Sequence, residues 1–227
     1  MAPGDGRSTP DSLFSDDGDD EPVALPVALR STPPIPGLWA FPGLLPLEVA
    51  KSTLAAIAEE DIFSGGRRDQ VMLFSRAGGS SLPSFLNDLI NETERLLSDR
   101  LPPEVMATLF SQPLARQVIL NMYPPGEGIS PHIDLPGRYA DGIVGVSLTG
   151  GCVMVLAKGE AVHHLYLPPR TVYVLTGPAR WEWSHGIAPR REETVEDEDG
   201  GEVRTVLRDL RVSVTFRWMK PGADVLS

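Results

Sequence analysis

The chain of 227 residues has little cysteine and no long apolar run. Its single cysteine, Cys152, cannot form an intramolecular disulfide or build a zinc site from several thiolates. Because it lies in the apolar run Cys-Val-Met-Val-Leu-Ala, we expect a buried thiol rather than a nucleophile. No stretch approaches the roughly eighteen consecutive apolar residues of a membrane helix, and the N-terminal segment lacks the apolar centre of a signal peptide. We therefore expect no membrane segment and a location in the cytoplasm, the nucleus or both.

The net charge of −11 is concentrated in two short acidic segments. Residues 1–21 carry seven acids and one base, and residues 192–202 carry seven acids and no base. The rest of the chain is therefore close to neutral, so the total charge does not exclude a nucleic-acid partner. We interpret both segments as solvated and flexible. The alternative is an acidic loop that competes with phosphate for a basic groove.

Composition divides the chain into a segment without a core, a folded domain and a tail. Residues 1–36 are rich in proline, glycine, serine and aspartate and are predicted to be disordered, because they cannot bury enough apolar surface. Residues 37–221 are predicted to form one domain, with an acidic loop inserted at 192–203, and residues 222–227 form the tail. We expect the protein to be a monomer.

Helical periodicity comes first along the chain, and strand periodicity follows. Apolar residues recur at helical spacing in three segments: 46–60, 84–98 and, over a shorter stretch, 102–110. From residue 114 short β-prone runs alternate with glycine and proline: 116–123, 143–149, 152–157, 162–167, 171–176, 181–187 and 205–218. This order predicts an α+β protein with a mainly β core, an antiparallel sandwich or barrel that follows N-terminal helices.

A candidate metal site lies in the predicted β region. His132 and Asp134 lie at positions i and i+2, so an extended segment directs both side chains to one point. His185 follows in a later run. Two imidazoles and one carboxylate make the facial triad that holds non-heme Fe(II) and leaves coordination positions open. The chain therefore offers a donor set for iron.

The last predicted strand carries its arginines on one face. Alternation at period two separates two sets of residues: Arg211, Ser213, Thr215 and Arg217 on one face, and Val212, Val214, Phe216 and Trp218 on the other. If the polar face lines the inside of a barrel, its guanidinium groups need an anionic partner. An edge strand with solvated arginines is the alternative. Asn121 and Tyr123, also at i and i+2, offer neutral hydrogen-bonding groups to an oxygen-rich ligand.

Three segments resemble the AlkB family of Fe(II)/2-oxoglutarate dioxygenases: Asn121-Met-Tyr-Pro-Pro-Gly-Glu-Gly-Ile-Ser-Pro-His-Ile-Asp, Ala179-Arg-Trp-Glu-Trp-Ser-His-Gly-Ile and Arg211-x-Ser-x-Thr-Phe-Arg. The resemblance covers roughly residues 37–220 and is strongest from residue 114 onward. It implies a double-stranded β-helix, or jelly roll, in which iron is bound by His132, Asp134 and His185. It also implies a 2-oxoglutarate site formed by Asn121, Tyr123, Arg211 and Arg217, with Ser213 where the family usually has asparagine. We expect Arg211 to bind the distal carboxylate of 2-oxoglutarate and count it with the three metal ligands as catalytic.

The resemblance further implies an enzyme that demethylates or hydroxylates a modified base in RNA, tRNA or DNA, with release of succinate and carbon dioxide. Its co-substrates would be 2-oxoglutarate and dioxygen, and the base would be single-stranded or flipped out of a duplex. Repair members commonly have an acidic residue two positions after the metal aspartate, where this chain has Pro136. Along residues 131–190 the chain looks closest to the branch that includes the tRNA wobble-uridine hydroxylase.

Two alternatives to this function remain. One is the same chemistry on a protein side chain or a small molecule, and the other is a jelly roll that binds a ligand without catalysis. Arg138, Tyr139 and Asp141 follow the predicted metal aspartate closely and are further candidates for substrate contacts, although a polar surface loop has the same composition.

Overall fold

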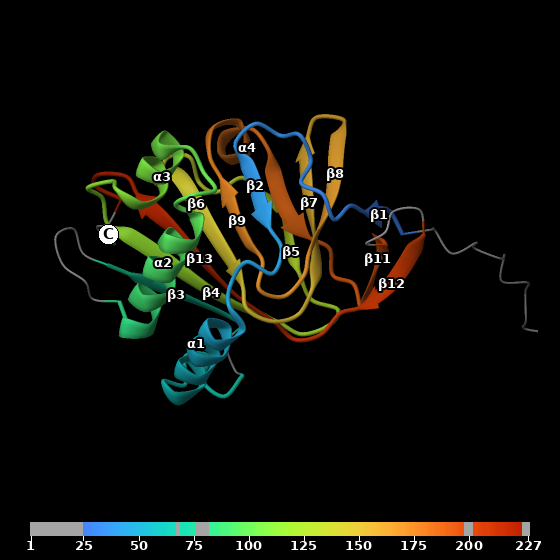
Figure 1. Cartoon of the computed structure of the whole chain (residues 1–227), viewed down its shortest axis with the longest axis horizontal. Helices are drawn as coiled ribbons and strands as arrows, with labels where there is room; N and C mark the ends of the chain where they lie inside the picture. The colour runs from blue at the N-terminus through green and yellow to red at the C-terminus, as the bar shows by residue number, and fades with distance from the viewer. Residues whose placement is uncertain (1–24, 67–68, 76–81, 198–201, 224–227) are drawn as a thin grey trace, which may run out of the picture.

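The computed structural model describes residues 25–66, 69–75, 82–197 and 202–223 (Figure 1). Its first half contains the three predicted helices: α1 (Leu47–Glu59), α2 (Ser84–Leu97) and α3 (Pro103–Phe110). Each helix begins after a proline whose extended backbone ends the preceding segment: Pro46, Pro83 and Pro102. The helical part of the sequence prediction is confirmed to within one or two residues at each end.

Two antiparallel sheets form the body of the domain. The larger sheet contains six strands in this order: β2 (Leu38–Phe41), β9 (Val172–Leu175), β6 (Tyr139–Ser147), β13 (Arg211–Met219), β4 (Arg116–Tyr123) and β3 (Gln70–Phe74). The smaller sheet contains four: β5 (Ile129–His132), β10 (Ser184–Ile187), β7 (Cys152–Lys158) and β8 (Ala161–Leu167). Side chains of both sheets share one apolar cluster that includes the buried Cys152. Two antiparallel sheets that share one core confirm the predicted jelly roll with a mainly β core.

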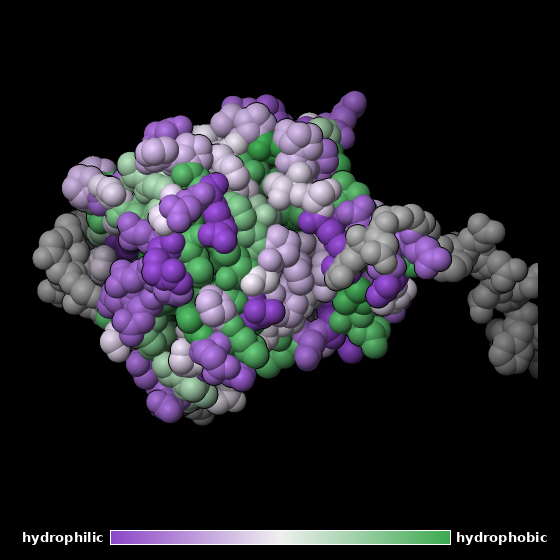
Figure 2. All heavy atoms as spheres, in the orientation of Figure 1, coloured by the Kyte–Doolittle hydropathy of each residue, from purple (hydrophilic) through white to green (hydrophobic). Residues whose placement is uncertain are grey.

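The helices cover the outer face of the larger sheet (Figure 1). Phe85, Leu86 and Leu89 of α2 share an apolar cluster with the β13 residues Val214 and Phe216. In Figure 2 hydrophilic residues cover the outward side of α2. Since the apolar face of β13 is turned towards the helices, its polar face lies between the two sheets, as the alternation in the sequence predicts.

A third, smaller sheet corrects two predictions. It consists of β1 (Val27–Ala28), β11 (Glu192–Glu196) and β12 (Val203–Leu207), which lie at one end of the molecule in Figure 1. Residues 1–24 of the predicted disordered segment lie outside the described residues, but the prediction is wrong for 25–36, where Ala28 and Ile35 are buried. The β1 strand is short, and its partner strand is distant in sequence.

The acidic loop predicted at 192–203 is also wrong over the part that the structure describes. Residues 192–196 form a strand that pairs antiparallel with β12, and Val195 is fully buried. Glu193 is buried as well, accepts a hydrogen bond from the Val153 amide and faces Arg190 and Arg208 at 3.9 and 4.0 Å. Burial raises the pKa of Glu193, and the two arginines oppose that shift. Residues 198–201 lie outside the described residues.

Other differences concern element boundaries. The predicted strand at 205–218 is two strands, β12 and β13. The one at 181–187 is shorter and begins at Ser184, because the short helix α4 (Gly177–Trp181) precedes β10. Strands β2, β3 and β5 were not predicted. Of the predicted tail 222–227, the last four residues lie outside the described part. No helix within the described residues is long and apolar enough to span a membrane.

Candidate metal centre and co-substrate pocket

Three potential metal ligands converge where β5 and β10 pair. The antiparallel register of these strands sets His132 directly opposite His185, and Asp134 follows β5 after one residue. The ligand atoms of the three residues all lie within 4.8 Å of one another. His132 Nε2 lies 3.8 Å from Asp134 Oδ1, and the two imidazole centroids are 4.6 Å apart. The geometry gives the predicted His-Asp-His set a common point at which it could hold one metal ion.

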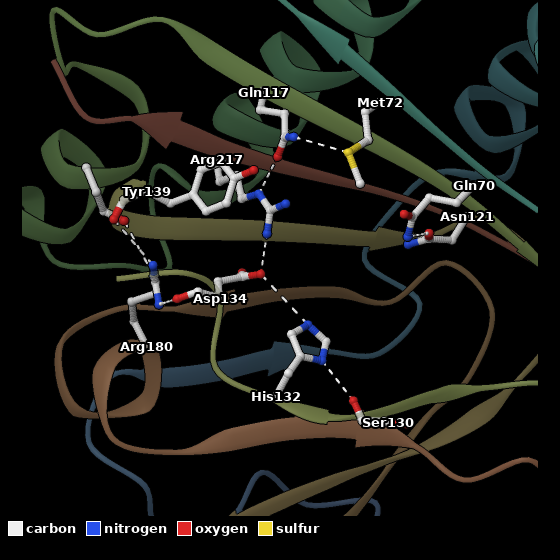
Figure 3. Close-up of polar contacts among 11 residues, drawn as sticks. Gln70, Met72, Gln117, Asn121, Ser130, His132, Asp134, Tyr139, Arg180 and Arg217 are labelled. Carbon is white, nitrogen blue, oxygen red and sulfur yellow. Dashed lines mark hydrogen bonds and ion pairs between the residues drawn. The ribbon is translucent and has the colours of Figure 1, made fainter. Parts of the chain in front are cut away.

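The surroundings of the two imidazoles suit metal binding. His132 Nδ1 lies 2.9 Å from the carbonyl oxygen of Ser130 (Figure 3), so the ring donates its Nδ1 proton there and leaves the Nε2 lone pair available. Burial lowers the pKa of His185 to about 4, with the nearby Asp134 opposing the shift. Burial therefore favours the neutral form of His185, which is the form that binds metals.

Two arginines hold Asp134 in place (Figure 3). Arg217 donates through Nη1 to the Asp134 carboxylate and through Nε to Gln117, and its guanidinium lies 3.7 Å from the centroid of the Tyr139 ring. Arg180 Nη1 donates to the Asp134 carbonyl oxygen at 2.9 Å, and Arg180 is only 2% exposed. The backbone and the carboxylate of Asp134 are thus fixed separately.

Arg180 was missed by sequence reasoning. It also contacts the carbonyl oxygens of Tyr139 and Ala140, each at 3.4 Å, so it organises the loop that follows Asp134. Its partners are backbone carbonyl oxygens about forty residues away. Since every residue has such an oxygen, the sequence gives no indication of these contacts. Arg217, which was predicted to bind 2-oxoglutarate, instead contacts the carboxylate of Asp134 in this structure.

Arg211 has the environment of an anion-binding group. It lies in β13, is 3% exposed, and donates to two neutral hydroxyls, Ser213 Oγ at 2.7 Å and Ser147 Oγ at 3.2 Å. Its buried Nε has no hydrogen-bond partner, and no acidic residue in the described part of the chain forms an ion pair with it. A buried guanidinium with an unsatisfied donor is costly unless an anion binds there. The site therefore fits a carboxylate-bearing co-substrate such as 2-oxoglutarate.

Asn121 and Tyr123 lie beside Arg211 because β4 pairs with β13. The register sets Tyr123 opposite Arg211 and Asn121 opposite Ser213. Asn121 Oδ1 accepts a hydrogen bond of 2.9 Å from Gln70 (Figure 3), which leaves its amide nitrogen free of that contact. Burial raises the pKa of Tyr123, while Arg211 opposes the shift, so the phenol stays protonated and can donate.

All the residues predicted for the metal and co-substrate sites line one cavity of about 410 Å³: Asn121, Tyr123, His132, Asp134, His185, Arg211, Ser213 and Arg217. Its volume lies within the usual range of small-molecule sites. Sequence reasoning missed Gln70 and Met72, which line the cavity from β3. Arg138 and Tyr139 also line it, whereas Asp141 accepts hydrogen bonds from the amides of Gly142 and Gly177 and stabilises the start of α4.

The part of the chain that forms this cavity is similar to a known protein family. Residues 44–217 match the model of the 2OG-Fe(II) oxygenase superfamily. The protein L905 of Acanthamoeba polyphaga mimivirus is 34% identical over 141 residues, which are 61% of this chain and 59% of that protein. The mouse tRNA (carboxymethyluridine(34)-5-O)-methyltransferase ALKBH8 is 37% identical over 112 residues, 44% of this chain and 17% of that protein. The alkylated DNA repair protein ALKBH8 homolog of Arabidopsis thaliana is 31% identical over 215 residues, 81% of this chain and 58% of that protein.

The chain thus spans less than two thirds of each of these relatives. Two solved structures share its fold at low sequence identity. A prolyl-4-hydroxylase of Pseudomonas putida has a TM-score of 0.50 at 13% identity and covers 82% of this chain and 94% of its own. A prolyl hydroxylase of Trichoplax adhaerens has a TM-score of 0.53 at 14% identity and covers 84% of this chain and 87% of its own.

Proposed function

Because the chain belongs to the 2OG-Fe(II) oxygenase superfamily, and is therefore a dioxygenase that uses Fe(II) and 2-oxoglutarate, we propose that it oxidises a modified base in nucleic acid. The observation that supports this substrate class is the similarity to relatives named for tRNA and for alkylated DNA. One of these similarities extends over 81% of the chain. The substrate would be an RNA, tRNA or DNA base presented in a single strand or flipped out of a duplex.

The cavity residues have separable roles in this proposal. His132, Asp134 and His185 would hold the iron, and Arg217 and Arg180 would keep Asp134 aligned with the two imidazoles. When bound, iron and 2-oxoglutarate supply an oxidation in which one oxygen atom of dioxygen enters a substrate C–H bond and the other enters succinate, with loss of carbon dioxide.

Arg211, which lines the cavity from β13, would orient the co-substrate. Its unpartnered Nε and its two hydroxyl partners provide a charge-assisted site for the carboxylate that does not bind the metal. The buried side chains of Ile143, Met154 and Leu167 line the same cavity and limit the access of water to the reacting groups.

The product class can be read from the fate of the oxidised carbon. On an N-methyl group the hydroxymethyl product releases formaldehyde, whereas on a carbon-linked group the alcohol persists. The proposal covers both an N-methylated base and a base with a carbon-linked group, and the released formaldehyde or the retained alcohol tells them apart. Family membership makes a jelly roll without catalysis the weaker alternative, and a protein or small-molecule substrate is the alternative outcome of the test.

The test uses the full chain with Fe(II), 2-oxoglutarate and dioxygen. Total tRNA and N-methylated single-stranded DNA are supplied in parallel, and succinate, formaldehyde and the digested nucleosides are measured by mass spectrometry. We expect succinate formation to rise when one nucleic acid is present, together with one altered nucleoside, and Asp134→Ala to abolish both. Stimulation by a protein extract treated with nuclease, with no response to either nucleic acid, would refute a nucleic-acid substrate.

A further inference from the structure

The cavity contains an arginine at its rim to which the metal and co-substrate chemistry gives no role. Arg138 lines the cavity from the loop between Asp134 and β6, and it is half-buried. Its Nε is buried without a hydrogen-bond partner, and it forms no ion pair with an acidic residue within the described ranges. A guanidinium charge that no described acid compensates, on a half-buried side chain that lines the cavity, can pair with an anionic ligand.

The three arginines that line the cavity differ in how their charge is compensated. Arg217 donates to the Asp134 carboxylate, so its charge is paired inside the protein. Arg211 is buried on β13 and donates to two hydroxyls of the co-substrate part of the site. The guanidinium of Arg138 contacts neither an acidic side chain nor a hydroxyl group of the described residues, and the residue is partly exposed to solvent.

The backbone of Arg138 is fixed on both sides. Its amide donates to the Leu135 carbonyl oxygen at 3.0 Å, and its own carbonyl oxygen accepts from the Lys220 amide at 2.9 Å. Its guanidinium lies 5.9 Å from the centroid of the Tyr139 ring, the same ring that Arg217 contacts. A side chain on an anchored backbone, beside an anchored ring, loses less conformational entropy when it binds a ligand.

The approach to Arg138 suits a ligand that is apolar on one side and anionic on the other. Leu135, Pro136 and Gly137 are exposed, and Leu135, at 60% exposure, also lines the cavity. No described acidic residue lines the cavity except Asp134, whose carboxylate is held by Arg217. A substrate that places a planar group near Leu135 would therefore meet one positive charge at the rim.

We propose that Arg138 binds an oxyanion of the substrate, close to the group that is oxidised. The oxyanion is a backbone phosphate beside the target nucleotide or a carboxylate on the base itself, since the planar guanidinium matches both in a two-point contact. This inference rests on the proposed function and narrows it to a nucleotide that carries a negative oxygen group at the cavity entrance.

The test measures binding to the Fe(II)-loaded full chain with 2-oxoglutarate, under anaerobic conditions, by fluorescence anisotropy. The probes are a single-stranded RNA oligonucleotide, the same oligonucleotide with uncharged methylphosphonate linkages, and the oligonucleotide with one carboxymethyluridine. The variants are Arg138→Gln, Arg138→Lys and the matched control Arg100→Gln, which changes an exposed arginine at the end of α2 that does not line the cavity. Each variant is first checked for an unchanged unfolding midpoint.

We expect Arg138→Gln to weaken binding about tenfold or more, the loss expected for a charged hydrogen bond. Arg138→Lys should recover part of the affinity, and Arg100→Gln should bind like the unaltered chain. If the phosphate is bound, the loss appears with the plain oligonucleotide, disappears with methylphosphonate, and lowers the salt dependence by about one counterion. If a carboxylate on the base is bound, the loss appears only with carboxymethyluridine.

Two results overturn the inference, and they can be told apart. Equal binding of every probe by Arg138→Gln and by the unaltered chain removes the role of Arg138 and leaves the proposed function standing. Failure of the unaltered chain to bind any of the probes removes the nucleic-acid function and the inference with it.

Discussion

Among single residues, the arginines of the cavity are distinguished by the groups that already compensate their charge. Among the described residues Arg211 has two hydroxyl partners and one unsatisfied nitrogen, and we propose that 2-oxoglutarate supplies its missing anion. A lysine at this position keeps the charge but loses the planar fork that can contact a carboxylate at two points. We therefore predict that Arg211→Lys weakens 2-oxoglutarate binding by about 1–3 kcal/mol, with little effect on iron affinity.

Anaerobic titration of 2-oxoglutarate into the Fe(II)-loaded protein, followed by its metal-to-ligand absorption band, measures this loss directly. Arg100→Lys makes the same replacement at an exposed position outside the cavity and serves as the control. An unchanged affinity in Arg211→Lys would assign the carboxylate to another cation of the cavity.

The sequence predicts those site residues whose relation is local or follows a strand period. His132 and Asp134 are two residues apart, and Arg211 and Arg217 share a face of one strand, so alternation alone relates them. Arg180 could not be found this way, because it acts on carbonyl oxygens that any sequence provides. The contact of Arg217 with Asp134 was equally hidden, since only the tertiary structure brings β13 to the loop after β5.

Among the elements, β6 shows how a strand shapes the cavity wall through a missing side chain. Gly145 pairs with Tyr173 on β9 and with Thr215 on β13. A Cβ atom at Gly145 would lie 2.0 Å from Cζ of Tyr173, whose ring lines the cavity. The ring occupies the space that a side chain on β6 would take.

We predict that Gly145→Ala destabilises the protein by about 1–3 kcal/mol, the usual cost of inserting a group into a packed interior. The cost should shrink when Tyr173→Leu is present, because the clashing ring atoms are then absent. Gly137→Ala adds the same methyl group where no atom lies within 4 Å and is the control. Urea unfolding of the four variants and the parent measures these differences, and an additive double variant would contradict the assigned clash.

Element prediction succeeded where periodicity is long and failed where pairing is distant. The apolar spacing of α1 and α2 extends over three or more turns, so both helices were found. Strand β11 was taken for a loop because acidic runs are usually solvated, yet Glu193 is buried against Arg208 and Arg190. Arg190 and Arg208 compensate the charge of Glu193 only once the chain is folded, and the sequence does not show these contacts.

For the whole molecule, residues 25–30 connect the small third sheet to the jelly roll. Ala28 is fully buried and shares an apolar cluster with Val153, Tyr166 and Val195. The Leu29 amide donates to the His164 carbonyl oxygen, and the Tyr166 amide donates to the Leu29 carbonyl oxygen, each at 2.8 Å. This segment therefore bonds to β8 on one side and to β11 on the other.

The Arg30 contacts complete the connection. The Arg30 amide donates to the Glu196 carboxylate at 2.6 Å, and its Nε donates to the Glu196 carbonyl oxygen at 2.8 Å. A chain that begins at residue 31 loses these contacts and the buried methyl of Ala28, whereas a chain that begins at residue 25 keeps them. Each hydrogen bond contributes about 0.5–1.5 kcal/mol, so we predict that the shorter chain is less stable by at least about 2 kcal/mol.

Urea unfolding of the two truncated chains tests the predicted difference in stability. Both chains lack residues 1–24, so they differ only in residues 25–30. Native-state hydrogen exchange adds a local readout, because the Tyr166 amide loses its acceptor in the shorter chain and should exchange faster. The amides that pair β7 with β8 keep their partners and should change little by comparison. Equal midpoints together with equal exchange at Tyr166 would show that residues 25–30, including β1, are not part of the cooperative fold.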